Sequence, residues 1–355
     1  YRVRPRGASF EMLEEVELLK SEDGIFRPCD AEVGPDGAVY VLDWAKDSPG
    51  GSQRSGDGVH GRLYRLSWRG RNGEPDLPLK PDSFARLRKL PDKHLVAALS
   101  TPDGGERRAI AREILRRGEA ASTLPASLIQ LLGTRDAPVT ARLAALSALQ
   151  GSWSDAAEEA CIALIDDPAA DVRRSALGAL ALSSRGVNES VDAALIRRGM
   201  DGDMTVRRAA AIVLARRCGP AAAGRLVESW SRLRQGADPF LASGIAYALE
   251  LTGTAGVAAL RAQLERGTAD LREAAVHALA SLHGPEAQRA LLDAATGASP
   301  LSPALRAACF RALPGFGEPP DAPSIAAWLL SHAAEPPEAR ARAMDALAIS
   351  GPSAR

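Results

Sequence analysis

Hydrophobic and polar positions follow one register from about residue 104 to the C-terminus. Each segment aligns on a position that is arginine in seven of eight cases: Arg108, Arg142, Arg173, Arg207, Ala242, Arg272, Arg306 and Arg340. Three residues later comes a small or apolar residue, and seven residues later comes a leucine, from Leu115 to Leu347. Both positions fall on one helical face, so they predict a buried stripe. The segments lie 30 to 35 residues apart, a period that indicates a repeat protein.

A second apolar helix is predicted before each aligned position. In the third repeat it covers residues 158–165, and a turn at residues 166–168 separates it from the start Asp171-Val172-Arg173. The aspartate favours a helix N-terminus. Two helices per unit, this start and an Ala/Leu-rich second helix resemble HEAT repeats over residues 92–351. The resemblance implies a mainly α protein, an α-α superhelical solenoid of about eight helix pairs.

The fifth repeat departs most from this pattern. It has Phe240-Leu241-Ala242 where the other repeats have an acidic and basic start. We consider this weak repeat an alternative domain boundary.

The N-terminal part alternates with the period of strands. Strands are predicted at residues 10–19, 27–33, 38–44 and 61–68, with a Gly-Pro-Asp-Gly turn at residues 34–37. They predict a small antiparallel sheet, and three prolines in residues 72–81 indicate a linker. We therefore predict a sheet domain over residues 1–70, a linker and first helix over 71–93, and a solenoid over 94–355. The sheet is expected to dock partly on the helices at residues 87–99, with the 45–60 loop mobile.

Composition agrees with stacked helices, because the chain is 46% apolar but only 4% aromatic. The formal net charge is zero and the last lysine is Lys93, which argues against nucleic-acid binding. No run of 18 apolar residues is present, so no transmembrane segment is predicted. The four cysteines form no Cys-x-x-Cys motif, and Cys161 and Cys309 are interpreted as buried small thiols.

The N-terminal motifs FRPCDAEVGPDGAVYVLDW and HGRLYRLSW, followed by HEAT-like repeats, resemble the large membrane-bound dehydrogenase-type proteins of planctomycetes and relatives. That resemblance implies that residues 1–70 are the last blade of a β-propeller similar to sorbosone or glucose dehydrogenases. It also implies a longer, exported, periplasmic or membrane-associated parent that binds a quinone cofactor, calcium and haem c. One blade cannot enclose a cofactor. We therefore expect no cofactor and no aldose oxidation for this chain by itself.

Candidate site residues follow from the same resemblance, because propellers gather functional groups around their channel. The candidates for cofactor binding, all in the N-terminal sheet region, are Arg27, Asp30, Asp43, His60 and Arg62. Four of them also have a structural interpretation: the aspartates can hydrogen-bond turns, Arg27 can pair with a neighbouring blade, and His60 can be an ordinary loop histidine. The loop with Asp47 and Asp57 lacks the ligand spacing of a calcium site, so no metal site is predicted. No catalytic residue is predicted.

Paired arginines at helix starts are the second group of candidates. Those proposed to bind an acidic protein partner are Arg173, Arg174, Arg207 and Arg208. The favoured alternative is an internal ladder in which they pair with Asp or Glu of the next repeat, as the equal numbers of acidic and basic residues suggest. Two functions therefore compete: a protein-binding scaffold joined to a propeller remnant, which we favour, and a part of a quinone-dependent sugar oxidoreductase.

Overall fold

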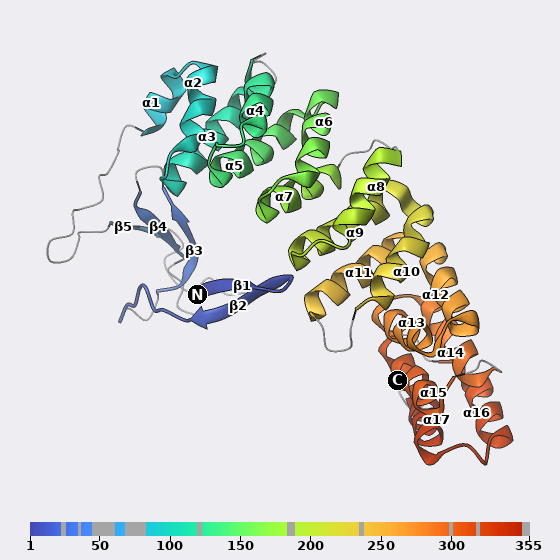
Figure 1. Cartoon of the computed structure of the whole chain (residues 1–355). Helices are drawn as coiled ribbons and strands as arrows, with labels where there is room; N and C mark the ends of the chain where they lie inside the picture. The colour runs from blue at the N-terminus through green and yellow to red at the C-terminus, as the bar shows by residue number, and fades with distance from the viewer. Residues whose placement is uncertain are drawn as a thin grey trace. The chain divides into compact units, whose positions relative to one another are not determined.

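The chain is mainly α-helical, with two small sheets at its N-terminus (Figure 1). The structure, a computed structural model, describes residues 1–22, 26–34, 37–44, 61–67, 83–118, 123–182, 189–233, 238–297, 301–316 and 320–349. Contacts divide the chain into two units. The first comprises Tyr1–Arg4 and Met12–Ala179, and the second comprises Pro5–Glu11 and Leu180–Arg355.

The N-terminal strands form a two-stranded and a three-stranded sheet. The two-stranded sheet contains β1 (Arg2–Arg6) and β2 (Ser9–Glu14), and the three-stranded sheet has the order β3 (Pro28–Val33), β4 (Val39–Asp43), β5 (Arg62–Leu66). All pairs in the larger sheet are antiparallel. Gly37 has φ of 81° in the β3–β4 turn, a conformation that glycine adopts without steric cost. The strands predicted at residues 27–33, 38–44 and 61–68 are thus confirmed. The strand predicted at residues 10–19 corresponds to β2, which ends at Glu14 and lies in a separate sheet with β1, a strand that was not predicted.

The larger sheet packs against the first repeat at α3 (Gly104–Arg117). Arg112 forms an ion pair with Glu32, and Gly105 lies so close to β3 that a Cβ atom there would be 2.7 Å from the Gly34 carbonyl oxygen. Val41 is buried, whereas Leu63 on the opposite face is 64% exposed. These contacts are with α3, C-terminal to the helices at residues 87–99 where docking was expected. The loop at 45–60 and the linker at 72–81 lie outside the described residues.

Eight helix pairs follow a single leading helix among the described residues. The helices of the N-terminal half are α1 (Ser83–Lys89), α2 (Asp92–Ala97), α3, α4 (Leu124–Gly133), α5 (Val139–Leu149), α6 (Asp155–Ala163) and α7 (Ala170–Leu180). In the first unit α2, α4 and α6 contact one another in sequence as one layer, and α3 contacts α5 in the other.

The second unit repeats the same two-layer plan. Its helices are α8 (Glu189–Arg198), α9 (Met204–Cys218), α10 (Ala223–Ser231), α11 (Pro239–Leu251), α12 (Thr254–Arg266), α13 (Ala269–Ser281), α14 (Pro285–Thr296), α15 (Pro303–Ala312), α16 (Ala322–Ser331) and α17 (Pro337–Ile349). Helices α10, α12, α14 and α16 form one layer, and α9, α11, α13, α15 and α17 form the other. The predicted HEAT-type α-α solenoid is confirmed. Among the described residues, no single helix could cross a bilayer, although α11 and α12, bent by 114°, pass such a test as a pair.

Helix boundaries follow from local chemistry. Asp103, Asp203 and Asp238 each accept hydrogen bonds from two backbone amides at the start of α3, α9 and α11. Such caps satisfy amides that have no partner inside the helix. In the part of the chain that the structure describes, short 3-10 turns follow helices at Ala98–Ser100, Gln150–Ser152, Leu164–Asp166, Gly219–Ala222 and Leu313–Phe316.

The repeating leucines occupy the core between the layers, with one correction. Six of the eight are buried: Leu149, Leu180, Leu214, Leu249, Leu279 and Leu313. In the first repeat, however, Leu115 is 47% exposed and Ile114 is 3% exposed. The cap at Asp103 fixes the start of α3, so that Ile110 and Ile114 face the core. The aligned residue of the first repeat is therefore Arg107, and the prediction of Arg108 was wrong by one position.

Replacing Leu214 with alanine tests this register. Leu214 is 7% exposed in the middle of the second unit, so we expect a loss of about 2–5 kcal/mol in the free energy of unfolding. Chemical denaturation followed by circular dichroism gives the value. Leu330→Ala is the matched control, because Leu330 is 85% exposed. Equal effects of the two substitutions would place Leu214 on the surface and contradict the register.

Candidate interaction surface

Three of the sequence candidates in the N-terminal sheet meet at Asp43. The Asp43 side chain is fully buried, and its Oδ1 accepts a hydrogen bond of 2.7 Å from the backbone amide of Arg27. Its Oδ2 lies 3.5 Å from Nε of Arg62, the residue opposite it on β5. Asp30 is exposed, and its carboxylate accepts from the amide of Ala31 at 2.8 Å. Asp43 therefore ties β4 to β5 and to the segment entering β3, while His60 lies outside the described residues.

The aligned arginines share a contact that the sequence did not reveal. In six of the seven, the guanidinium donates to backbone carbonyls near the end of the preceding helix: Arg107 to Leu99 and Thr101, Arg173 to Asp167 and Pro168, Arg207 to Gly199, Arg272 to Leu264, Arg306 to Ala295 and Gly297, and Arg340 to Ala333. Carbonyls at a helix C-terminus lack partners within the helix and attract cations. Each of these six arginines thus binds the first helix of its own pair to the second.

The expected pairing of an aligned arginine with an acidic residue of the next repeat is present at Arg142. Arg142 forms a buried ion pair with Asp167 of the following repeat. Among the four arginines predicted to bind a partner, Arg173 and Arg207 are half-buried and donate to carbonyls. Arg174 is exposed and lies 3.3 Å from Asp171 in its own helix.

Arg208 differs from the other three because its side chain crosses to the next helix of its layer. A Cβ atom on Gly244 of α11 would lie 2.4 Å from Cγ and 2.8 Å from Nε of Arg208. The stem of Arg208 therefore lies on the bare backbone at Gly244, and no larger residue fits there without moving it. Arg208 itself is exposed.

The N-terminus of α11 carries a carboxylate close to this arginine. Asp238 accepts from the amides of Phe240 and Leu241, both at 2.9 Å, and from that of Ala8 at 2.7 Å. Burial opposes ionisation of Asp238, but these three amides and nearby Arg208 together lower its pKa. The carboxylate is thus charged and already bonded at neutral pH.

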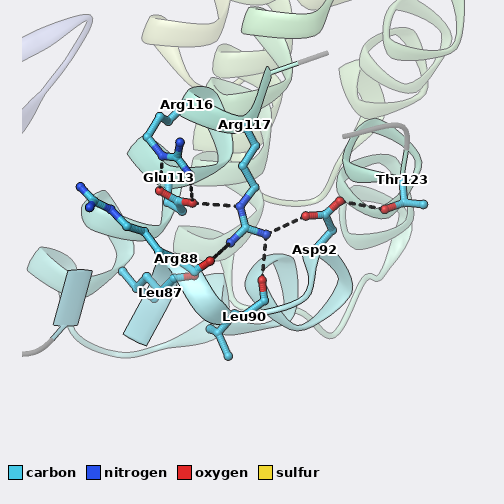
Figure 2. Close-up of polar contacts among 8 residues, drawn as sticks. All are labelled: Leu87, Arg88, Leu90, Asp92, Glu113, Arg116, Arg117 and Thr123. Carbon is cyan, nitrogen blue, oxygen red and sulfur yellow. Dashed lines mark hydrogen bonds and ion pairs between the residues drawn. The ribbon is translucent and has the colours of Figure 1, made fainter. Parts of the chain in front are cut away.

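A dense polar network joins the first three helices (Figure 2). The guanidinium of Arg117 donates to the carbonyls of Leu87 at 3.0 Å and Leu90 at 2.8 Å, and to the carboxylates of Asp92 at 2.7 Å and Glu113 at 2.9 Å. Its side chain is 14% exposed and that of Glu113 is 5% exposed. Arg117 therefore links α1, α2 and α3.

The same network sets the charge of Glu113. Arg116 donates two hydrogen bonds of 2.7 Å to this carboxylate. The bonds from Arg116, opposed by burial and aided by Arg117, lower the pKa of Glu113 to about 2. Asp92 extends the network, since its other oxygen accepts from Thr123 at 3.1 Å (Figure 2). The network is a structural clamp whose groups satisfy one another.

Cys161 and Cys309 are fully buried, as predicted. Burial, with the nearby carboxylate of Glu158, raises the pKa of Cys161 to about 12. Burial also raises the pKa of Cys309 to about 12, despite the opposing charge of Arg306. Since the thiolate is the reactive form, both cysteines are inert at neutral pH.

The second helices of the pairs present a row of unlike side chains to solvent. The position five residues after the aligned residue is exposed at Tyr247, His277, Arg311 and Asp345 of the second unit, and it is half-buried at Ile212. We call these five residues the second-helix row. In these five repeats the third position after the aligned residue is alanine three times and the seventh is leucine every time, whereas the row has a different residue in each repeat.

Helix α11 adds exposed apolar side chains to the row. Phe240 is 49% exposed, Tyr247 43% and Leu251 38%. They lie seven and four residues apart, and hence on one face of the helix. We call these three residues the α11 stripe. Sequence reasoning identified this repeat only as irregular, but phenylalanine at a position that is polar or small in the other repeats was the available signal.

Comparison with known proteins gives a family match for the N-terminal part. A model described as a domain of unknown function, DUF7133, matches residues 1–67. No curated protein matches the chain. The DUF7133 description names no activity, so the resemblance to propeller dehydrogenases stays a prediction.

Similar solved structures consist of helical repeats or contain them. The Escherichia coli protein YibA is 15% identical, covering 79% of this chain and 99% of its own, with a TM-score of 0.40. The complex of CpcE and CpcF of phycocyanin lyase from Nostoc is 15% identical, covering 74% and 96%, with a TM-score of 0.34. A designed armadillo repeat protein in complex with the peptide (KR)4 is 19% identical, covering 73% and 99%, with a TM-score of 0.27.

Proposed function

We propose that this chain is a protein-interaction scaffold that binds an extended segment of a partner protein along the second-helix row. The observation that carries the proposal is the contrast between core and row. Alanine, leucine and arginine recur at the positions that hold the repeats together, whereas the row is different in each repeat: aliphatic, aromatic, imidazole, cationic and anionic. A stack of repeats that places unlike side chains at one repeated position can recognise the sequence of a chain lying across it.

The packing leaves the row available for a partner. Six repeat arginines, from Arg107 to Arg340, donate to carbonyls of their own helix pair, as Arg207 does at 3.2 Å to Gly199. These backbone contacts do not use the side chains of the row. Tyr247 and Arg311 are both exposed, and Arg311 also lies 3.4 Å from Glu338 of the last repeat. Electrostatic and apolar contacts at such positions give a binding surface its specificity.

Selection from a library of random peptides tests this function. We expect the folded chain to enrich particular sequences that bind saturably in fluorescence anisotropy. A variant with Tyr247→Ala and Arg311→Ala is expected to weaken their binding about tenfold or more, which is 1.4 kcal/mol. The matched control is Arg289→Ala with Leu330→Ala, two exposed residues of the first-helix layer. Equal binding by both variants, or enrichment of no sequence above heat-unfolded protein, would contradict the proposal.

A further inference from the structure

The fifth repeat forms an apolar strip between a basic and an acidic helix. Helix α11 contacts α9 on one side and α13 on the other. On α9, Arg208 and Arg216 are exposed, whereas α13 carries the exposed Asp270. The α11 stripe lies between these two helices. Charge along this part of the surface therefore changes from positive through apolar to negative.

Both sides of the stripe are held in place. On the basic side, the stem of Arg208 rests on Gly244, which is four residues from Phe240 and three from Tyr247, so the cation lies over the same face of α11. On the acidic side, the indole nitrogen of Trp230 donates to the Ala274 carbonyl at 2.7 Å and binds α13 to α10. Groups already fixed in position lose less conformational entropy when a ligand binds.

We infer that the α11 stripe and its two flanks bind an extended peptide segment that carries an acidic residue, an apolar or aromatic residue and a basic residue in that spatial order. The inference deepens the proposed function and rests on it. The acidic residue pairs with Arg208, the apolar residue covers Phe240 and Tyr247, and the basic residue meets Asp270 and Glu273. Glu273 also lies 4.0 Å from His277 in its own helix, so the acidic flank includes a histidine.

The helix spacing sets the spacing in the peptide. Neighbouring packed helices are about 8–10 Å apart, and an extended chain covers about 3.3 Å per residue. One step between helices therefore corresponds to about three residues. The segment then has the pattern acidic-x-x-apolar-x-x-basic, read in either chain direction, because the side chains of the surface do not fix the direction of the backbone.

Charge complementarity selects this occupant over a purely apolar one. The stripe offers only three apolar side chains, each between 38% and 49% exposed, with charged groups on both sides. A large apolar surface would exclude water from the exposed charges of Arg208 and Asp270, which is costly. A peptide with matched charges avoids that cost and excludes like-charged competitors.

Synthetic peptides measure the pattern directly. The probe is the labelled peptide ESSFSSK, and the controls are ESSSSSK without the aromatic residue, ESSFSSE and KSSFSSK. We expect ESSFSSK to bind the full chain at least about tenfold more tightly than each control in fluorescence anisotropy. Equal affinity for ESSFSSK and ESSSSSK, or for ESSFSSK and KSSFSSK, overturns the inference.

Two variants assign the binding to the residues named. Phe240→Ser with Tyr247→Ser is expected to lower affinity for ESSFSSK to that for ESSSSSK, whereas Leu330→Ser with Arg289→Glu leaves it unchanged. Arg208→Glu is expected to reverse the preference, so that KSSFSSK binds more tightly than ESSFSSK. A gain of binding cannot come from unfolding, so this reversal is the decisive readout. An unchanged preference in Arg208→Glu overturns the assignment.

The remaining outcomes separate this inference from the proposed function. Peptides from the random library that keep their affinity in the Phe240→Ser, Tyr247→Ser variant would leave the scaffold function standing and overturn the α11 site. A second copy of the chain is the other possible occupant. Sedimentation showing a dimer that the same variant dissociates, together with no binding of ESSFSSK, would mean that the stripe is a self-association surface and would overturn the inference.

Discussion

Arg117→Ala should lower the free energy of unfolding of the first repeats by about 3–5 kcal/mol, the usual cost of removing one partner from a buried ion pair. The substitution leaves the nearly buried carboxylate of Glu113 and that of Asp92 without their shared cation. It also removes the donor to the carbonyls at the end of α1. Hydrogen exchange of the α1, α2 and α3 amides in the full chain gives the local value, with faster exchange expected in all three helices.

Arg116→Ala is the matched control for this experiment. Arg116 binds the same carboxylate, but it is 60% exposed and contacts no second helix in the network, so we expect a much smaller loss than for Arg117→Ala. The dependence of the free energy of unfolding on pH gives a second readout. The pKa of Glu113 falls from 4.5 to about 2, so its contribution to stability is full above pH 4.5 and disappears as the pH approaches 2. Arg117→Ala should therefore lose less stability on acidification than the unsubstituted chain. Equal losses from the two arginine variants would disprove the special role of Arg117.

Phe310→Ala should destabilise the last repeats by about 3–5 kcal/mol, because it leaves a large cavity in a packed core. Phe310 is fully buried in α15, and its ring centroid lies 4.8 Å from that of Trp328 in α16. Arg306 lies 6.0 Å from the same tryptophan ring, so the phenylalanine supports a three-residue cluster.

The effect of Phe310→Ala should remain local. In repeat proteins each unit contacts chiefly its neighbours, so faster hydrogen exchange is expected in α14–α17 and little change in α8–α10. Phe240→Ala is the control, since Phe240 is 49% exposed and its loss should change stability by no more than about 0.5 kcal/mol. Uniformly faster exchange throughout the chain would show that the repeats unfold as one cooperative body.

The repeat architecture could be predicted because its signal is periodic. Alanine and leucine recur at regular intervals, so a misaligned repeat does not change the predicted fold. The first repeat shows the limit of such alignment. Both Arg107 and Arg108 fit the pattern, and only the cap by Asp103, which accepts from Gly105 at 2.8 Å, settles which residue faces the first helix. Strand β1 was missed because its sequence, RVRPR, is charged and contains a proline.

The contacts of the candidate site were harder to predict, for a physical reason. Arginine is visible in a sequence, but its acceptor here is a backbone carbonyl, which every residue has. Arg142 has the expected acidic partner, whereas Arg207 and Arg272 donate to the carbonyls of Gly199 and Leu264. The position of Arg208 over Gly244 depends on the crossing of two helices, which repeat periodicity does not specify.

The arginine contact inside each helix pair has a consequence for how such a chain can change in length during evolution. Donor and acceptor lie in the same repeat, as with Arg272 and the Leu264 carbonyl, 3.2 Å apart. A duplicated gene segment encoding one repeat would therefore carry both halves of the bond with it. Insertion or deletion of whole repeats leaves every remaining arginine its acceptor. The ion pair of Arg142 with Asp167 joins two successive repeats, so it forms only where those two repeats remain neighbours.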